Sequence, residues 1–160
     1  MFHMNKDYLN IYNNLIKLTR NKTLYIKLEK QDTFSHRLIF LFFHLSLFFK
    51  HFKNTTSSKN LQEFFDFTIK QIELSIRELG HGDVTVNKNM KKFINIFYSI
   101  IDQIETLDLS DKENQLTLIK KYLNTDKNLD FYVEYFNKYR VFLSKNTLNY
   151  FTKDIINLNF

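Results

Sequence analysis

The sequence has no cysteine, no proline, no tryptophan and no alanine, and it has only two glycines. Without cysteine, the chain can form no disulfide framework, no cysteine-ligated zinc site and no iron–sulfur cluster. Two glycines cannot supply a glycine-rich phosphate-binding loop, and neither common phosphate-loop motif occurs. The abundant residues include lysine, asparagine, isoleucine, phenylalanine and tyrosine, all of which have A/T-rich codons. This composition indicates an A/T-rich source genome.

The length and composition predict one folded domain over residues 1–160. Hydrophobic residues make up 44% of the chain and charged residues 25%, which is ordinary for a globular protein. Lysine and arginine number 23 against 17 aspartates and glutamates, so the net charge is +6. This modest excess favours anionic partners such as nucleic acid, acidic lipid headgroups or a ribosomal surface. Codon bias toward lysine explains the same excess equally well.

The most hydrophobic stretch is residues 38–49, which read LIFLFFHLSLFF. It is 12 residues long and contains His44 and Ser46, whereas a membrane-spanning helix needs about 20 apolar residues. The stretch therefore predicts a buried core helix. The first residues resemble neither a secretory signal nor a transit peptide. We expect a soluble or peripherally membrane-bound protein.

Helical spacing of apolar residues runs through the chain and predicts a single compact all-α domain of about six to eight helices. No long alternating run indicates a strand. Thr85 is the expected N-cap of one helix, and Ser110 with Glu113 forms an expected capping box for another. The predicted helices cover residues 5–20, 22–30, 34–52, 61–79, 86–107, 111–123, 129–143 and 147–156.

No motif predicts catalysis, and we expect neither an enzyme nor a bound cofactor. His44 and His51 lie seven residues apart, about 10.5 Å along a helix, so they cannot share one metal ion. The spacing favours a polar stripe on a packed helix. Haem ligation by His44 is an alternative that no motif supports. No nucleophile with a neighbouring base is evident.

Both glycines, Gly80 and Gly82, lie between two predicted helices, which predicts a tight turn that needs either positive φ or close approach of the backbone. Lys88, Lys91 and Lys92 follow near the expected start of the next helix. Lysines beside the free amides of a helix N-terminus predict an anion-attracting locus. The alternative is a solvated basic face beside an ordinary turn between helices.

Residues 77–92, which read RELGHGDVTVNKNMKK, closely resemble the signature of the ubiquinol–cytochrome c chaperone family. The family pattern is approximately L-R-E-[ML]-G-x-G-D-[LV]-[ST]-V-x-K-x-[MI]-[KR]-K. Phe97 and Tyr98 match the family's F-Y-G helix end, with Ser99 in place of the glycine. Upstream, Asp32, Thr33 and Arg37, followed by residues 38–44 ending in His44, resemble the family's D-T-x-x-x-R-F…L-H segment. Residues 64–66 resemble the family's F-F-x-D-M-D region. Spacing agrees from about Tyr12 to Tyr98.

The resemblance implies an all-α assembly factor for respiratory complex III, ubiquinol–cytochrome c reductase. Mitochondrial members bind newly made cytochrome b, cooperate with a small partner protein and associate with the ribosome, whereas bacterial members are much less characterised. The resemblance also implies a cytoplasmic protein peripherally associated with the inner membrane, on the matrix side if the source is a eukaryote. The codon bias and the lack of a transit peptide suit an alphaproteobacterial member. The partner-binding candidates at matched positions are Arg77, Glu78, Gly80, Gly82, Asp83, Lys88, Lys91 and Lys92. The structural or family-motif candidates are Asp32, Thr33, Arg37, His44, Phe97 and Tyr98.

A second reading is a basic helical module that binds nucleic acid or the ribosome without a respiratory client. Such a module should carry a second basic cluster with base-reading arginines. The chain has four arginines, and the sequence shows no such cluster, so DNA is not an expected partner. An amphipathic structural subunit is a third reading.

Overall fold

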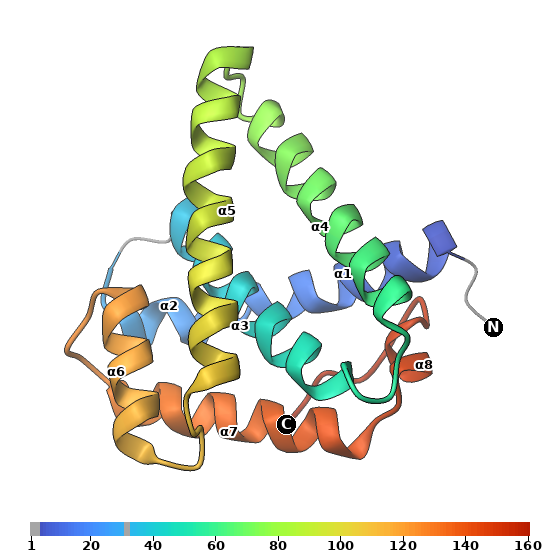
Figure 1. Ribbon diagram of the computed structural model, residues 1–160. Coiled ribbons are helices and arrows are strands. Elements are labelled where there is room, and N and C mark those ends of the chain that lie inside the picture. Colours follow the sequence, from blue (N-terminus) through green and yellow to red (C-terminus); the bar gives the residue numbers. More distant parts are fainter. Residues whose placement is uncertain (1–3, 31–32) are drawn as a thin grey trace.

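The computed structural model describes residues 4–30 and 33–160. This part of the chain contains eight helices and no strand, which confirms the predicted all-α domain (Figure 1). The helices are α1 (Met4–Thr19), α2 (Lys22–Leu28), α3 (Phe34–Phe52), α4 (Ser58–Glu78), α5 (Asp83–Thr106), α6 (Lys112–Leu123), α7 (Leu129–Lys145) and α8 (Leu148–Phe151).

Helix α3 is the centre of the molecule. Every side chain of residues 38–48 is buried, because α3 packs against α1, α5, α6 and α7 on its different sides. A helix that is hydrophobic all round must be covered all round, and the predicted core helix is confirmed. Across the described ranges, no helix is long and apolar enough to cross a membrane.

Aromatic side chains make much of the contact between α3 and its neighbours. The ring of Phe42 stacks on that of Phe97 from α5, with centroids 4.6 Å apart. Phe48 packs against Phe64 from α4 and Phe151 from α8, at 5.8 and 5.5 Å. Through these large side chains, α3 contacts helices that lie far from it in the sequence. The chain has no alanine, the small residue that would allow helices to approach closely.

Two predicted N-caps are wrong. Helix α5 begins at Asp83 with Gly82 as its N-cap, so Thr85 lies inside the first helical turn. Helix α6 begins at Lys112, and its N-cap is Asp111, whose carboxylate accepts the Glu113 N–H at 2.9 Å. The Ser110 hydroxyl instead donates to Asp108 at 2.6 Å, which removes it from the cap.

The predicted last helix is shorter than expected. Helix α8 has four residues, and the chain after it forms irregular structure along α1. The Asn14 amide on α1 donates to the carbonyls of Phe151 and Lys153, both at 2.9 Å. Asn10 similarly donates to the Thr152 carbonyl at 2.8 Å. These side chains satisfy carbonyl groups that a longer helix would have paired internally, so the helix ends early.

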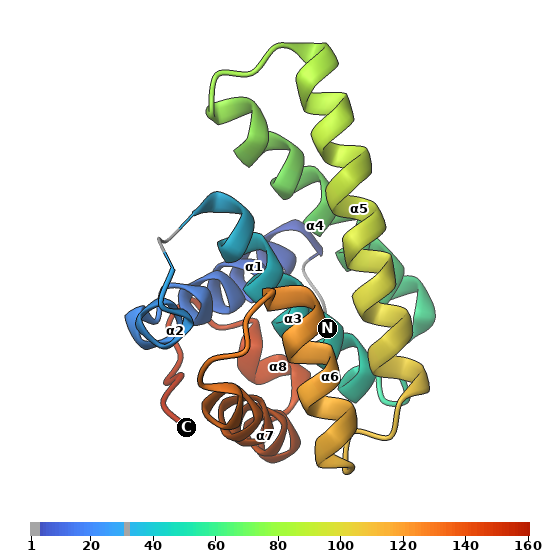
Figure 2. The same ribbon diagram turned by 90° about the vertical axis from the view of Figure 1, so that its left-hand side faces the viewer.

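Helices α4 and α5 form a hairpin that rises from the rest of the molecule (Figures 1 and 2). The C-terminal half of α5 lies beside α3 and α6, while the two helices converge at the turn between them. The turn is the end of the hairpin farthest from α7. The segment that resembles the family signature, residues 77–92, therefore lies at the projecting end of the molecule.

Candidate functional site

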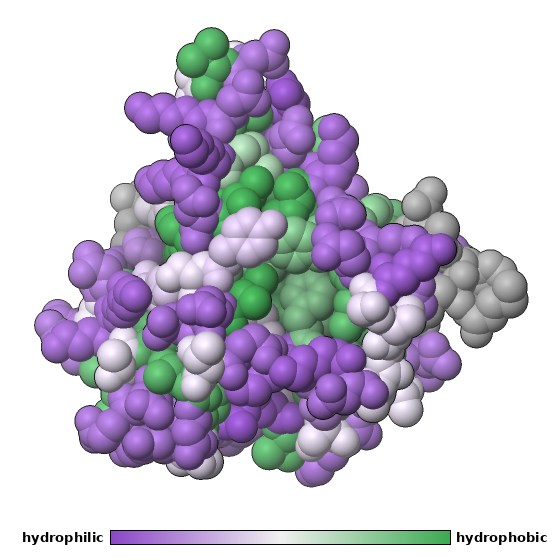
Figure 3. All heavy atoms as spheres, in the orientation of Figure 1, coloured by the Kyte–Doolittle hydropathy of each residue, from purple (hydrophilic) through white to green (hydrophobic). Residues whose placement is uncertain are grey.

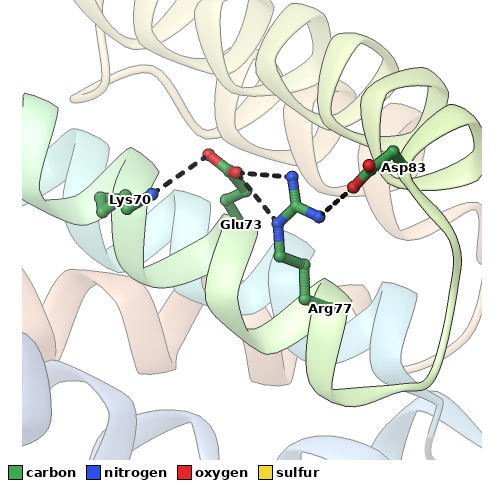
Figure 4. A network of polar contacts seen from close by, with 4 residues as sticks. All are labelled: Lys70, Glu73, Arg77 and Asp83. Carbon is green, nitrogen blue, oxygen red and sulfur yellow. Dashed lines mark hydrogen bonds and ion pairs between the residues drawn. The ribbon is translucent and has the colours of Figure 1, made fainter.

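A network of ion pairs joins α4 to α5 at the hairpin turn (Figure 4). The Arg77 guanidinium on α4 contacts the Asp83 carboxylate on α5 at 2.6 Å and the Glu73 carboxylate at 3.1 Å. The Nζ of Lys70 lies 4.0 Å from Glu73. The hydrogen bonds to Asp83 and Glu73 raise the pKa of Arg77. Arg77 and Asp83, both predicted to bind a partner, thus contact each other and hold the turn together.

The two glycines of the turn differ in their backbone conformation. Gly80 follows the end of α4 with φ of +87°, the left-handed region in which a glycine commonly ends a helix. Gly82 has φ of −75° and ψ of 167°, which any residue adopts, so the prediction of positive φ at Gly82 is wrong. A Cβ added at either glycine would meet no atom within 4 Å. The turn is therefore open to solvent, and packing constrains neither position.

The three lysines of the signature are exposed, but they do not lie at the start of α5. Because α5 begins at Asp83, Lys88 lies about 7 Å along the helix from its first residue, and Lys91 and Lys92 lie farther. The predicted locus of lysines beside free helix N–H groups is therefore wrong. Lys88 and Lys91 form a basic face along α5 instead, and the Nζ of Lys92 lies 5.6 Å from the Phe93 ring.

A hydrophobic hollow lies between α4 and α5 below the turn (Figure 3). The Phe65 ring on α4 stacks on Phe97 at 5.4 Å and on Tyr98 at 5.7 Å, both from α5. Tyr98 is 53% exposed. Ile69 on α4 lies one helical turn from Phe65, Ile94 and Ile101 on α5 lie one turn on either side of Tyr98, and all three are only partly buried. We call Phe65, Ile69, Ile94, Tyr98 and Ile101 the hairpin hollow.

Ion pairs lie at both ends of the hairpin hollow. The Arg77–Asp83 pair closes the turn end, and Lys53, just after α3, contacts Glu105 on α5 at 2.5 Å near the other end. The Arg77–Asp83 pair joins α4 to α5, and the Lys53–Glu105 pair joins the segment after α3 to α5, with the apolar side chains of the hollow between the two pairs. A partly exposed apolar surface between two helices is the kind of surface to which an apolar helix can bind.

The upstream family-motif residues support helix α3. Thr33 is its N-cap, and the Thr33 hydroxyl accepts the His36 N–H at 3.3 Å. Arg37 is exposed in the first turn of the helix. Asp32 lies outside the described residues. Of the other candidates, Phe97 is fully buried on α5, and Glu78 is exposed at the end of α4.

His44 is a core residue. Its Nδ1–H donates to the Phe40 carbonyl at 2.6 Å, because a carbonyl can only accept, and its Nε2 accepts the Tyr135 hydroxyl at 2.7 Å. The Tyr139 hydroxyl donates to the His44 carbonyl at 2.9 Å. Burial lowers the pKa of His44 to about 4. Within residues 4–30 and 33–160, no group of three potential metal ligands occurs.

The structure also assembles a second basic cluster that the sequence analysis missed. Lys30, Lys120, Lys121 and Lys127 line a recess of about 510 Å³ where the ends of α2 and α6 meet. Lys120 pairs with Asp126 at 2.8 Å, and Lys127 pairs with Glu29 at 2.7 Å. These lysines come from segments some 90 residues apart, so only the tertiary fold brings them together.

Comparison with models of protein families gives a match. The family model described as "Ubiquinol-cytochrome C chaperone" matches residues 27–125, from the end of α2 past the end of α6. The matched region includes α3, the α4–α5 hairpin and three of the four recess lysines, Lys30, Lys120 and Lys121, whereas Lys127 lies just beyond it. No curated protein and no solved structure matches the chain.

Proposed function

The chain belongs to the ubiquinol–cytochrome c chaperone family, and on this basis we propose that it assists the assembly of respiratory complex III by binding newly made cytochrome b. Membership in a chaperone family implies a non-enzymatic role. The client in this proposal is a membrane protein whose apolar helices need temporary cover before they reach their final partners. Such cover requires an accessible apolar surface that the chaperone itself keeps in shape.

The hairpin hollow is the observation that carries this proposal. Its five apolar side chains come from two helices, and they are only partly covered by the rest of the molecule. Amphipathic or apolar helices bind such surfaces through a strip of side chains spaced three and four residues apart. Covering several half-exposed apolar side chains contributes roughly 5 to 8 kcal/mol before the costs of association. The resulting affinity would be micromolar or weaker, which suits a client that must be released.

Two basic surfaces suit the other contacts expected for such a factor. The exposed face with Lys88 and Lys91 would meet an anionic membrane surface, since each lysine near such a surface contributes about 1 kcal/mol. The recess with Lys30 and Lys121 is a candidate contact for ribosomal RNA. A small partner protein would bind elsewhere on the molecule.

The nucleic-acid-binding alternative has gained one observation, the recess lysines. Two of the four are paired with carboxylates, however, and α6, which carries Lys120 and Lys121, presents no arginine to read bases. These features suit backbone contact on a ribosome better than sequence-specific binding. The two proposed functions predict different co-isolated molecules, namely cytochrome b for a chaperone and RNA alone for an RNA-binding module. One isolation experiment therefore distinguishes them.

The test is the isolation of tagged chain from cells that are synthesising cytochrome b, with identification of the co-isolated protein and RNA. We expect Tyr98→Asp, which places a charge in the hairpin hollow, to lose cytochrome b and to lower the amount of assembled complex III. Val141→Asp is the matched control, because Val141 on α7 is 50% exposed against 53% for Tyr98. Recovery of cytochrome b with Tyr98→Asp, or of RNA alone with the unchanged chain, would contradict the proposal.

A further inference from the structure

The hairpin turn exposes two aliphatic side chains at its end. Val84 is 84% exposed and Leu79 is 53% exposed, and every residue of 77–85 is exposed. Figure 3 shows hydrophobic atoms at the extreme end of the projecting hairpin. Single exposed aliphatic residues are common on protein surfaces, but here two lie together on the part of the molecule that projects farthest.

Positive charge lies directly behind these side chains. Lys88 and Lys91 follow Val84 by four and seven residues, so all three lie on one face of α5. Lys88 is about 6 Å and Lys91 about 10 Å farther from the turn than Val84 along the helix axis. Residues 70–92 carry five positive and three negative side chains. Two of those negative side chains, Glu73 and Asp83, contact Arg77.

We propose that the α4–α5 turn inserts Leu79 and Val84 into an anionic lipid bilayer, while Lys88 and Lys91 contact the lipid phosphates. The spacing suits this arrangement, because the headgroup layer is about 5 to 8 Å thick on each side of the hydrocarbon core. Lysines one and two turns behind an inserted valine would lie at the depth of the phosphates. The Arg77–Asp83 pair would enter the bilayer surface as a neutral unit. Of the acidic side chains in the turn, Glu78 is the one without an ion pair in the described structure.

A bilayer suits this surface better than a protein or a nucleic acid does. A stable protein interface buries well over 1,000 Å² in total, which a narrow projecting turn with two aliphatic side chains cannot supply. An RNA backbone would use the lysines but would leave the aliphatic side chains in water. A bilayer accepts both, since shallow insertion combines buried apolar side chains with attraction to anionic lipids.

If the turn inserts into a membrane, the hairpin hollow is held in a defined position relative to that membrane. This consequence rests on the proposed function, whereas the insertion itself does not. A hairpin inserted by its turn would hold the hairpin hollow next to the membrane surface, with α4 and α5 rising from it. Tyr98 lies 14 residues behind Val84, about 21 Å along α5, so an apolar segment that extends that far from the surface would reach Phe65 and Tyr98. The membrane contact would therefore place the hollow where its client is made.

Because the chain has no cysteine, a single introduced cysteine can carry an environment-sensitive fluorophore. We would label Val84→Cys and, as a matched control, Ile155→Cys, since both positions are 84% exposed and Ile155 lies in the C-terminal segment. The probe vesicles are equal parts phosphatidylglycerol and phosphatidylcholine, with phosphatidylcholine alone for comparison. We expect a blue shift, and quenching by lipid-attached nitroxides, at position 84 with the anionic vesicles only. A label at 84 that stays in water, or equal responses at 84 and 155, would overturn the proposal.

Vesicle co-sedimentation then separates insertion from charge attraction. Leu79→Ser and Val84→Ser should each weaken binding about tenfold, with Ile155→Ser unchanged. Lys88→Gln and Lys91→Gln should each weaken it about fivefold at low salt, with Lys145→Gln unchanged. Loss with the lysine variants alone would mean surface adsorption and would overturn insertion.

Client binding by the same variants distinguishes the two proposals. In detergent, without a bilayer, Leu79→Ser/Val84→Ser should retain cytochrome b, whereas Tyr98→Asp should lose it and still bind vesicles. Vesicle binding without client binding by the unchanged chain would contradict only the proposed function. Client binding without vesicle binding would contradict only the insertion.

Discussion

Helix α3 and the α4–α5 turn lie in the same family-matched region, yet they differ in almost every physical respect. Every side chain of residues 38–48 is buried, and every residue of 77–85 is exposed. In the first segment, the volume and polarity of each side chain are constrained by its packing against neighbouring residues. The second is not packed against other residues, although it forms the first part of the run, residues 77–92, that resembles the family signature. The difference fits the proposal that α3 builds the core and that the turn makes contacts outside the molecule.

The largest expected difference between the two regions is in stability. Phe48→Ala should lower the free energy of unfolding by about 3 to 5 kcal/mol, because Phe48 is fully buried against rings from α4 and α8. Val84→Ala in the turn should change it by less than about 0.5 kcal/mol. Urea unfolding of both variants measures the difference. A comparable loss in both would mean that the turn contributes to the core after all.

The pH dependence should also come from the α3 region. The pKa of His44 is lowered by burial to about 4, against an ordinary value of 6.5 in the unfolded chain, so protons bind the unfolded state more tightly. The stability contribution is complete above pH 6.5 and is lost as the pH falls toward 4, by about 3 kcal/mol. Urea unfolding across this range checks the slope. His44→Gln should flatten it, and an unchanged slope in that variant would assign the effect to another group.

Within the turn, the two glycines should respond differently. Gly80→Ala should cost about 1 kcal/mol, because its φ of +87° is unfavourable for any residue with a Cβ. Gly82→Ala should stay within about 0.5 kcal/mol, since its backbone is ordinary and no atom lies within 4 Å of an added Cβ. Thermal unfolding of the pair is the measurement. Equal losses would show that the second glycine is also constrained.

The smallest expected effect concerns the ion pairs of the turn. Arg77→Gln should leave the global unfolding transition nearly unchanged, because Arg77, Glu73 and Asp83 are all near the solvent. It should speed amide hydrogen exchange at residues 79–86 while exchange in α3 stays slow. Lys138→Gln, which removes the exposed Lys138–Glu134 pair on α7, is the control. Unchanged exchange in the turn would show that backbone hydrogen bonds alone fix it.

Local patterns predicted the helices well, since residues 61–79 carry strong apolar periodicity and residues 38–49 form one nearly continuous apolar run. They also placed Gly80 at the end of α4. They failed where two short polar residues competed for one cap, as with Ser110 and Asp111, and where a glycine capped a helix, as Gly82 does. The wrong start of α5 then moved Lys88 too close to the helix N-terminus.

Local sequence patterns could not predict contacts between residues that are far apart in the sequence. The Tyr135 partner of His44 lies 91 residues away, and the recess lysines come from separate segments. The hairpin hollow could not be found either, because Phe65 and Tyr98 read as ordinary apolar positions of two amphipathic helices. Whether such positions are covered depends on how far the helices separate, which spacing along one helix does not encode.

Photo-crosslinking during cytochrome b synthesis tests the role of the hairpin most directly. A photoreactive amino acid at position 98, in the hairpin hollow, is compared with one at position 141 on α7, which is almost equally exposed. We predict crosslinks to newly made cytochrome b from position 98 and not from position 141. Crosslinks from position 141 alone, or equal yields from both, would contradict the assignment of the α4–α5 hairpin as the client-binding region.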